Sequence, residues 1–280
     1  MKKILVTGTS GFLGSRIVDF YKDRYHMLTP SHSEMDITDE TSVFSYFENK
    51  KPDIVIHCAA ISDTAACEKD PLLSQKVNVL GSENIARAAK YHSAKAILCS
   101  SDQVYCGCTH INPNTEDDPL NPSNVYGKDK AYTEELCLQI DPDSVHLRLA
   151  WMYDPIQVKS YSRNDFLKQV KNAIENHTSL ALPINDRRGI TDVWEVVTSV
   201  EKTFDLPGGV YNFGSPNDKN TYETVEDIFQ ILNLDTSLLV KREYTTARNL
   251  TMSQSKLNQH GIFFSSTKES LLHHLKRIFS

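Results

Sequence analysis

The sequence lacks any apolar run long enough to cross a membrane, since a spanning helix needs about 18 or more consecutive apolar residues. Gly8 and Gly11 interrupt the apolar stretch at the start of the chain, which argues against a secretory signal. The sequence also lacks a block of basic residues, and its net charge is −6. We therefore expect a cytoplasmic protein that has neither membranes nor nucleic acid as partners.

Cysteine and histidine do not form the pairs of clusters that a metal site requires. The six cysteines are Cys58, Cys67, Cys99, Cys106, Cys108 and Cys137. The stretch Cys106-Gly107-Cys108-Thr109-His110 has ligand-like spacing, but no second Cys/His pair accompanies it. We expect no metal, and we interpret the cysteines as reduced thiols in a reducing compartment.

What the sequence does contain is an alternation of short apolar strands and amphipathic helices in its first half. The expected strands are Lys3–Thr7, His26–Thr29, Asp53–Cys58, Ala96–Ser101 and Val145–Leu149. The expected helices are Gly11–Arg24, Ser42–Lys50, Leu73–His92 and Tyr126–Ile140. Strands that alternate with helices form βαβ units, so the fold class is α/β with a doubly wound parallel sheet of the Rossmann type.

The pattern is looser after about residue 150. The expected helices there are Asn164–Asn176, Asp192–Phe204, Thr224–Leu232 and Lys268–Ile278, and the expected strands are Leu180–Leu182 and Val210–Phe213. We predict a dinucleotide-binding domain over residues 1–150 and a small C-terminal α/β substrate cap over 151–280, some elements of which return to the first domain.

A glycine-rich loop follows the first expected strand. Gly8, Gly11 and Gly14 have the spacing G-x-x-G-x-x-G between a strand and an amphipathic helix. Gly8 allows a tight turn, Gly11 lets backbone N–H groups approach a pyrophosphate, and Gly14 lets the helix pack closely on the sheet. The helix N-terminus adds partial positive charge, so the loop predicts a dinucleotide site.

The end of the second expected strand bears on which dinucleotide binds. A site for NAD usually has an acidic residue there, which binds the ribose 2′-OH. Here the chain reads Thr29-Pro30-Ser31-His32-Ser33, and the first acid is Glu34. We therefore favour NADP over NAD. Asp36 either binds the adenine amine or begins the N-cap of the next helix.

Three Tyr-x-x-x-Lys pairs occur, and their positions in the expected sheet separate them. The pairs are Tyr46/Lys50, Tyr91/Lys95 and Tyr126/Lys130. Ligands of such sheets bind beyond the carboxyl ends of the strands, and only the last pair follows such an end. The strand before it finishes in Ser100-Ser101-Asp102, which places hydroxyl groups at the same edge.

These groups can reduce a carbonyl. Tyr126 supplies the proton for the new alkoxide, and Ser101 orients the substrate oxygen. Because the pKa of tyrosine is about 10, we expect the ammonium of Lys130, one helical turn away, to lower it. A shift of about three units corresponds to roughly 4 kcal/mol. Lys130 can also hold the nicotinamide ribose.

At this point the chain resembles a known family, the extended short-chain dehydrogenase/reductases, and within it the dTDP-4-dehydrorhamnose reductase group. The residues that carry the resemblance extend over most of the chain. They are Thr7 to Gly14, Met35-Asp36-Ile37-Thr38-Asp39, Pro52 to Ala60, Val77-Asn78, Ser100 to Tyr105, Asn121 to Lys130 and Leu147 to Tyr153.

The resemblance implies roles for particular residues. Ser101, Tyr126 and Lys130 would be the catalytic triad. The residues implied to bind the cofactor are Gly8, Ser10, Gly11, Phe12, Leu13, Asp36, Ile37, Ala59, Ala60 and Ser100, together with Tyr126 and Lys130. The residues expected near the substrate are Asp102, Gln103, Trp151 and Arg187, and a buried core position is the alternative for Trp151.

Two departures from the family pattern concern the substrate. Gln103 stands where the reductases usually have an aromatic residue, and Arg187 stands where glutamine is common. A guanidinium at Arg187 can grip a diphosphate or serve as a surface charge. Sugar-nucleotide dehydratases resemble this chain but carry Asp-Glu after the triad hydroxyl, whereas here an amide, which cannot take a proton, follows Asp102.

The leading hypothesis is the NAD(P)H-dependent reduction of a nucleotide-linked 4-keto sugar, with the proton from Tyr126. Two alternatives stay open. One is a sugar-nucleotide epimerase that keeps its NAD bound. The other is an NADP-binding regulatory subunit without turnover, because some relatives are partners of methionine adenosyltransferase. The expected partner is a nucleotide sugar, and a homodimer is left open.

Overall fold

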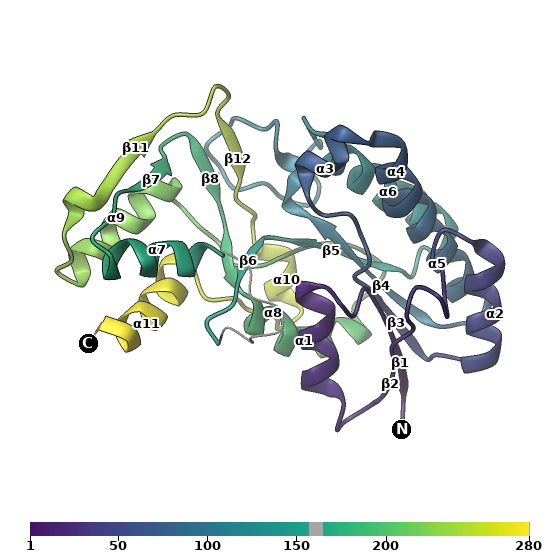
Figure 1. Ribbon diagram of the computed structural model, residues 1–280. Helices are drawn as coiled ribbons and strands as arrows, with labels where there is room; N and C mark the ends of the chain where they lie inside the picture. Colours follow the sequence, from purple (N-terminus) through teal and green to yellow (C-terminus); the bar gives the residue numbers. More distant parts are fainter. Residues whose placement is uncertain (157–164, 280) are drawn as a thin grey trace. The chain divides into compact units, whose positions relative to one another are not determined.

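The structure, a computed structural model, describes residues 1–156 and 165–279 (Figure 1). Its chain divides into two compact units. Unit 1 consists of Met1–Val104, Pro122–Leu149 and Val197–Tyr211. Unit 2 consists of Tyr105–Asn121, Ala150–Val196 and Asn212–Ser280. No helix among the described residues is long and apolar enough to cross a membrane.

A six-stranded sheet organises unit 1. Its strands are β1 (Lys3–Thr7), β2 (His26–Leu28), β3 (Ile54–His57), β4 (Lys95–Ser101), β5 (Val145–Leu149) and β10 (Gly209–Phe213). Their spatial order is β10-β5-β4-β3-β1-β2, and the five strands from the first half of the chain pair in parallel. The predicted parallel, doubly wound sheet is therefore confirmed. Strands are added in opposite directions from β1, and ligands of such sheets bind at this switch.

Helices pack on the sheet of unit 1. They are α1 (Phe12–Tyr21), α2 (Glu40–Lys50), α3 (Thr64–Lys69), α4 (Pro71–Gln75), α5 (Gly81–Tyr91) and α6 (Val125–Ile140). The core on one face joins Leu5, Val55 and Leu98 of three strands to Phe47 and Ile85 of α2 and α5. These side chains recur at strand and helix spacing, and this periodicity explains why the elements could be predicted.

The prediction of one continuous helix over Leu73–His92 was wrong in its first half. A π-helical turn, Lys76–Leu80, separates α4 from α5. The carbonyl of Asn78 in this turn accepts hydrogen bonds from the hydroxyls of Ser82 (2.7 Å) and Thr133 (3.2 Å). Side chains thus bind a carbonyl that a regular helix would pair with an N–H group, and apolar periodicity does not reveal such contacts.

The described residues of unit 2 form three two-stranded parallel pairs. They are β7 (Leu180–Pro183) with β11 (Leu239–Arg242), β8 (Asp186–Arg188) with β12 (Arg248–Leu250), and β6 (Trp151–Tyr153) with β9 (Ile190–Asp192). Only β7 among these was expected from the sequence. The other five have three or four residues each, too few for an alternating pattern to stand out.

The helices of the second half agree better with expectation. They are α7 (Phe166–Glu175), α8 (Val193–Val200), α9 (Thr221–Ile231), α10 (Ser255–Gln259) and α11 (Thr267–Phe279). The predicted helix Asp192–Phe204 is regular only to the end of α8, and a 3₁₀ turn, Glu201–Asp205, follows it. Helix α9 starts three residues earlier than predicted because Asn220 and Glu223 form a capping box. Residue Asn164 of the expected Asn164–Asn176 helix lies outside the described residues.

Two buried histidines in unit 1 stay neutral in the fold. Burial, together with the positive charge of Lys130, lowers the pKa of His57 to about 3. Burial and the charges of Lys130 and Arg148 likewise lower the pKa of His146 to about 3. An unfolded histidine has a pKa near 6.5, so between these values the unfolded chain binds more protons than the folded one.

We expect the free energy of unfolding to fall as the pH drops from 7 to 5. Each of these histidines contributes about 2 kcal/mol to this loss, because one pKa unit corresponds to about 1.4 kcal/mol. Urea titrations at both pH values measure it. His146→Gln should reduce the pH dependence, while His26→Gln, at an exposed position, should leave it unchanged. An equal pH dependence in all three proteins would contradict this account.

Candidate active site

The glycine loop between β1 and α1 is packed so closely that side chains are excluded. Gly8 has φ +67°, and a Cβ atom there would lie 2.7 Å from the backbone nitrogen of Ala59. A Cβ on Gly14 would lie 2.4 Å from the carbonyl oxygen of Gly8. The N-cap residue of α1 is Gly11, which has no side chain to bind the first-turn N–H groups. These donors and the open cradle fit the pyrophosphate of a dinucleotide.

A chain of hydrogen bonds ties this loop to the end of β3. The Ser82 hydroxyl donates to the Asn78 carbonyl, so Nε2 of His57 donates to Ser82 (3.1 Å). Nδ1 of His57 then accepts from the Thr7 hydroxyl (2.8 Å), whose oxygen accepts from the Ala59 N–H (3.1 Å). A neutral His57 satisfies both directions. The predicted cofactor residues Ala59 and Gly8 are thus fixed to each other.

Asp36, which was predicted to lie near the adenine, has local partners. Its carboxylate accepts from the N–H and the hydroxyl of Thr38, both at 2.9 Å, and these bonds lower its pKa. The N-cap of α2 is Asp39, not Asp36, because the Asp39 side chain accepts from the Thr41 N–H. Ile37 packs against Gly81, where a Cβ would lie 2.8 Å from its side chain.

The loop after β2 holds a carboxylate that sequence analysis undervalued. Glu34 accepts from both the N–H and the hydroxyl of Ser31 at 2.8 Å. These hydrogen bonds lower the pKa of Glu34, so it is ionised at neutral pH. Ser31 therefore donates to an acid of its own loop.

Ser101, Tyr126 and Lys130 come together at the carboxyl end of β4. The hydroxyls of Tyr126 and Ser101 share a hydrogen bond. The ammonium of Lys130 donates to the Cys99 carbonyl at 2.7 Å and lies 5.8 Å from the centre of the Tyr126 ring. All three side chains are buried.

The pKa of Tyr126 is raised in this structure, whereas a lowered value was expected. Burial raises the pKa of Tyr126, and the hydrogen bond to Ser101 only partly offsets it. Burial lowers the pKa of Lys130. Tyr126 is therefore a neutral phenol at physiological pH, which is the protonation state that a proton donor needs.

Gln103 links the end of β4 to the start of α6. Its amide nitrogen donates to Asp102 (3.2 Å), and its amide oxygen accepts from Asn124 (3.0 Å). Asn124 is the N-cap of α6 and accepts from the Gly127 N–H at 2.7 Å. Gln103 thus holds the helix turn that carries Tyr126. It was expected only beside the substrate.

Sequence analysis also missed a buried ion pair beneath this edge. Arg148 binds the Glu134 carboxylate through two nitrogens, the shortest contact being 2.7 Å, and both side chains are about 4% exposed. Glu134 also accepts from the Ser100 hydroxyl at 2.5 Å. An arginine within the apolar run Val145–Leu149 was the available signal, because a buried charge requires a partner.

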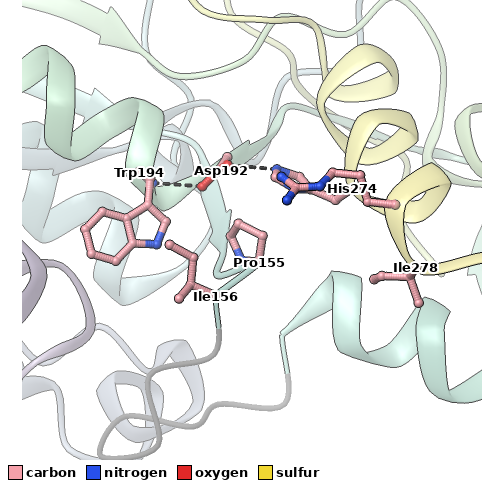
Figure 2. A pocket seen from close by; sticks show the side chains of 7 residues that line it. Pro155, Ile156, Asp192, Trp194, His274 and Ile278 are labelled. Atoms are coloured by element: carbon pink, nitrogen blue, oxygen red, sulfur yellow. Dashed lines mark hydrogen bonds and ion pairs between the residues drawn. The ribbon is translucent and has the colours of Figure 1, made fainter.

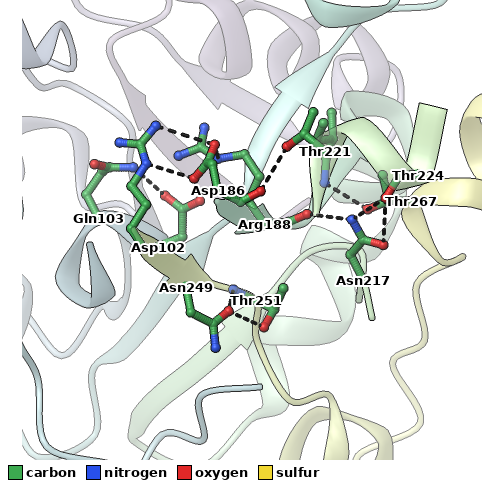
Figure 3. Close-up of polar contacts among 12 residues, drawn as sticks. Asp102, Gln103, Asp186, Arg188, Asn217, Thr221, Thr224, Asn249, Thr251 and Thr267 are labelled. Carbon is green, nitrogen blue, oxygen red and sulfur yellow. Dashed lines mark hydrogen bonds and ion pairs between the residues drawn. The ribbon is translucent and has the colours of Figure 1, made fainter. Parts of the chain in front are cut away.

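In unit 2, the predicted substrate residue Trp151 is 37% exposed, so it is not a core residue. The guanidinium of Arg188 lies 5.3 Å from the centre of its ring. Arg187, also predicted, instead donates to the Asp218 carbonyl. The buried Asp186 carboxylate binds Arg188 and Arg248 (Figure 3). Sequence analysis selected neither Arg188, which lies near Trp151, nor Arg248, which pairs with Asp186 of β8.

Unit 2 also has a cavity of about 430 Å³ beside its C-terminal helix (Figure 2). Its lining residues are Pro155, Ile156, Asp192, Trp194, His274, Arg277 and Ile278. Asp192 lies between two of them, since it binds His274 at 2.9 Å and accepts from the Trp194 N–H at 2.8 Å. Asp192, His274 and the Trp194 N–H therefore already bind one another.

The sequence is similar to one protein family and to two kinds of known protein. A model of the family described as RmlD substrate binding domain matches residues 1–266. A dTDP-4-dehydrorhamnose reductase of Aggregatibacter actinomycetemcomitans is 30% identical over 77% of this chain and 74% of that protein. The methionine adenosyltransferase 2 subunit beta of Xenopus laevis is 29% identical over 85% of this chain and 74% of that protein.

The fold also matches solved structures. A dTDP-4-dehydrorhamnose reductase from Bacillus anthracis, solved in complex with NADP, has a TM-score of 0.84 to this chain. The match covers 99% of each chain at 21% identity. At that identity the likeness shows a shared fold.

We expect Arg148→Met to destabilise the protein by about 3–5 kcal/mol, because the Glu134 charge would stay buried without its partner. Arg87→Met is the matched control, since it breaks an exposed i,i+4 pair with Glu83 and should cost no more than about 0.5 kcal/mol. Urea unfolding measures both. Equal losses in the two variants would show that burial does not set the strength of the Arg148 pair.

Proposed function

This chain belongs to the RmlD substrate binding domain family, and from that premise we propose that it reduces a nucleotide-linked 4-keto sugar of the dTDP-4-dehydrorhamnose type with NADPH. The observation that carries the proposal is the buried set of Ser101, Tyr126 and Lys130 at the carboxyl end of β4. The same sheet edge carries the glycine loop, whose geometry fits a dinucleotide.

In the proposed reaction the residues of this chain bind, orient and protonate. When bound, the reduced nicotinamide supplies the hydride. Ser101 donates to the substrate oxygen and keeps it in line with the Tyr126 hydroxyl, with which it already shares a hydrogen bond. Tyr126 transfers its proton to the developing alkoxide. The Lys130 ammonium stabilises the phenolate that remains and holds the ribose.

The amide of Gln103, which stands where a dehydratase has its carboxylate base, supports reduction rather than dehydration. A dehydratase needs a base beside the triad hydroxyl, and Gln103 is an amide whose two ends are bound by Asp102 and Asn124. An epimerase would have to keep its dinucleotide between turnovers. NAD⁺ retained by the purified protein would support that reading over ours.

A regulatory subunit is the second candidate, favoured by the similarity to the methionine adenosyltransferase subunit of Xenopus laevis. It would bind dinucleotide without turnover. The buried triad supports the enzyme, because a pure binding module needs no proton donor at this position. We also place the protein in the cytoplasm, where reduced thiols and NADPH coexist.

We expect Tyr126→Phe to slow the reduction of a dTDP-4-keto-6-deoxy sugar by about 10²–10⁴-fold, because the proton donor is lost. Its affinity for NADPH should stay within about twofold, since the phenyl ring keeps the same volume. Absorbance of the reduced nicotinamide follows turnover, and its fluorescence follows binding. A Phe variant with normal turnover would show that another group is the acid.

Gly11→Val is the converse variant. A Cβ at Gly11 would lie 3.0 Å from the Gly8 carbonyl, and the branched side chain would fill the cradle in front of α1. We expect NADPH binding to be lost, which calorimetry measures directly. If the variant stays folded and binds NADPH normally, the glycine loop is not the site.

We propose NADPH as the preferred cofactor, with NADH as the weaker alternative, and Glu34 as the residue that limits the preference. Glu34→Gln should raise the affinity for NADPH relative to NADH about five- to tenfold, because an exposed negative charge would no longer oppose the 2′-phosphate. Glu40→Gln, an acid in the first turn of α2, is the control. An unchanged ratio would place Glu34 away from the ribose.

A further inference from the structure

Two cysteines meet on neighbouring strands of unit 1. His57 of β3 pairs with Leu98 of β4, so the next residue of each strand, Cys58 and Cys99, stand opposite each other. Their sulfur atoms are 3.6 Å apart, which is van der Waals contact. Both residues are partly exposed to solvent. Neither thiol has a role in the proposed reaction.

The backbones of these two cysteines support both halves of the candidate site. A Cβ on Gly8 would lie 2.9 Å from the carbonyl carbon of Cys58, so this residue packs against the glycine loop. The carbonyl of Cys99 accepts the hydrogen bond of the Lys130 ammonium at 2.7 Å. A change in the distance between β3 and β4 at this point would therefore move both the glycine loop and Lys130.

We propose that Cys58 and Cys99 are a redox-modification site at which a hydroperoxide forms a reversible disulfide that impairs the active site. The formation of the disulfide is inferred from the thiol geometry alone. Its effect on turnover rests on the proposed reductase function.

The chemistry requires hydrogen peroxide or another hydroperoxide as the oxidant. The hydrogen bond from Cys58 and the charge of Lys130 lower the pKa of Cys99, which makes it the attacking thiolate. Its sulfur bonds to one peroxide oxygen as the O–O bond breaks, and the leaving hydroxide takes a proton to become water. The Cys58 sulfur then attacks Cys99, and the second oxygen leaves as water. Two thiols and one peroxide thus give one disulfide and two waters.

The disulfide would shift the backbone that holds Lys130. An S–S bond is about 2.05 Å long, so the sulfur atoms must approach by ~1.5 Å from their present 3.6 Å. Displacements of about 1 Å at a catalytic group can cost about 10²-fold in rate. We expect at least a tenfold loss of turnover that a dithiol reductant restores by thiol–disulfide exchange.

The test uses the purified, reduced full-length chain and hydrogen peroxide added in equal molar amount. After alkylation of the remaining thiols, mass spectrometry of proteolytic peptides should show a Cys58–Cys99 cross-link, with four of the six cysteines alkylated. Dithiothreitol should remove the cross-link. This readout requires no turnover, so it can fail or succeed independently of the proposed reductase activity.

The variants separate this pair from the other thiols. Cys58→Ser and Cys99→Ser should each lose the cross-link and, relative to the turnover of the same variant before treatment, the peroxide sensitivity. Cys137→Ala is the matched control, because burial raises the pKa of Cys137 to about 12, and it should respond like the unmodified protein. A disulfide between Cys106 and Cys108, oxygen added to single cysteines without a cross-link, or no reaction would each overturn the proposal.

Discussion

The docking of α6 on β4 in a single register is the constraint on which the candidate site depends. Three side chains, one at the N-cap and two further along the helix, fix it. Asn124 binds Gln103, Lys130 donates to the Cys99 carbonyl, and Glu134 accepts from the Ser100 hydroxyl. These contacts follow β4 from Cys99 to the turn after it. A helix held at three successive points cannot slide or rotate, so Tyr126 and Ser101 share a hydrogen bond without a ligand to bring them together.

This register concentrates positive charge in the interior of unit 1. Lys130 and Arg148 are both buried, and Glu134 provides the carboxylate that neutralises Arg148. Burial is the main reason why His57 and His146 stay neutral, and the charge of Lys130 adds to it at both, with that of Arg148 at His146. Neutral His57 is in turn needed for the hydrogen bonds that join Thr7 to Ser82. The electrostatics of the catalytic edge and the structure of the glycine loop are therefore one system.

The sequence was sufficient where one periodic signal determines the structure. The strands of the large sheet and the helix that carries Tyr126 follow from apolar spacing, and strand polarity selected Tyr126/Lys130 from three similar pairs. The sequence was insufficient where side chains bind the backbone or one another, because apolar spacing carries no signal for such contacts. The π-helical turn at Asn78, the Glu134–Arg148 pair and the hydrogen bond of Ser31 to Glu34 are of this kind. The short strands of unit 2 were missed because three residues show no period.

Gln103 illustrates how a departure from a family pattern acquires a physical meaning. From the sequence it was a missing aromatic residue and a missing dehydratase base. In the structure its amide connects Asp102 to the N-cap of α6, a link that needs a donor and an acceptor on one side chain. A glutamate could accept from Asn124 but would place a second carboxylate beside buried Asp102. That added charge would further favour a protonated Tyr126, whereas the amide keeps the helix turn in place without it. The neutral phenol, whose pKa is raised mainly by burial, suits a site that gives a proton to its substrate, which is the direction of carbonyl reduction.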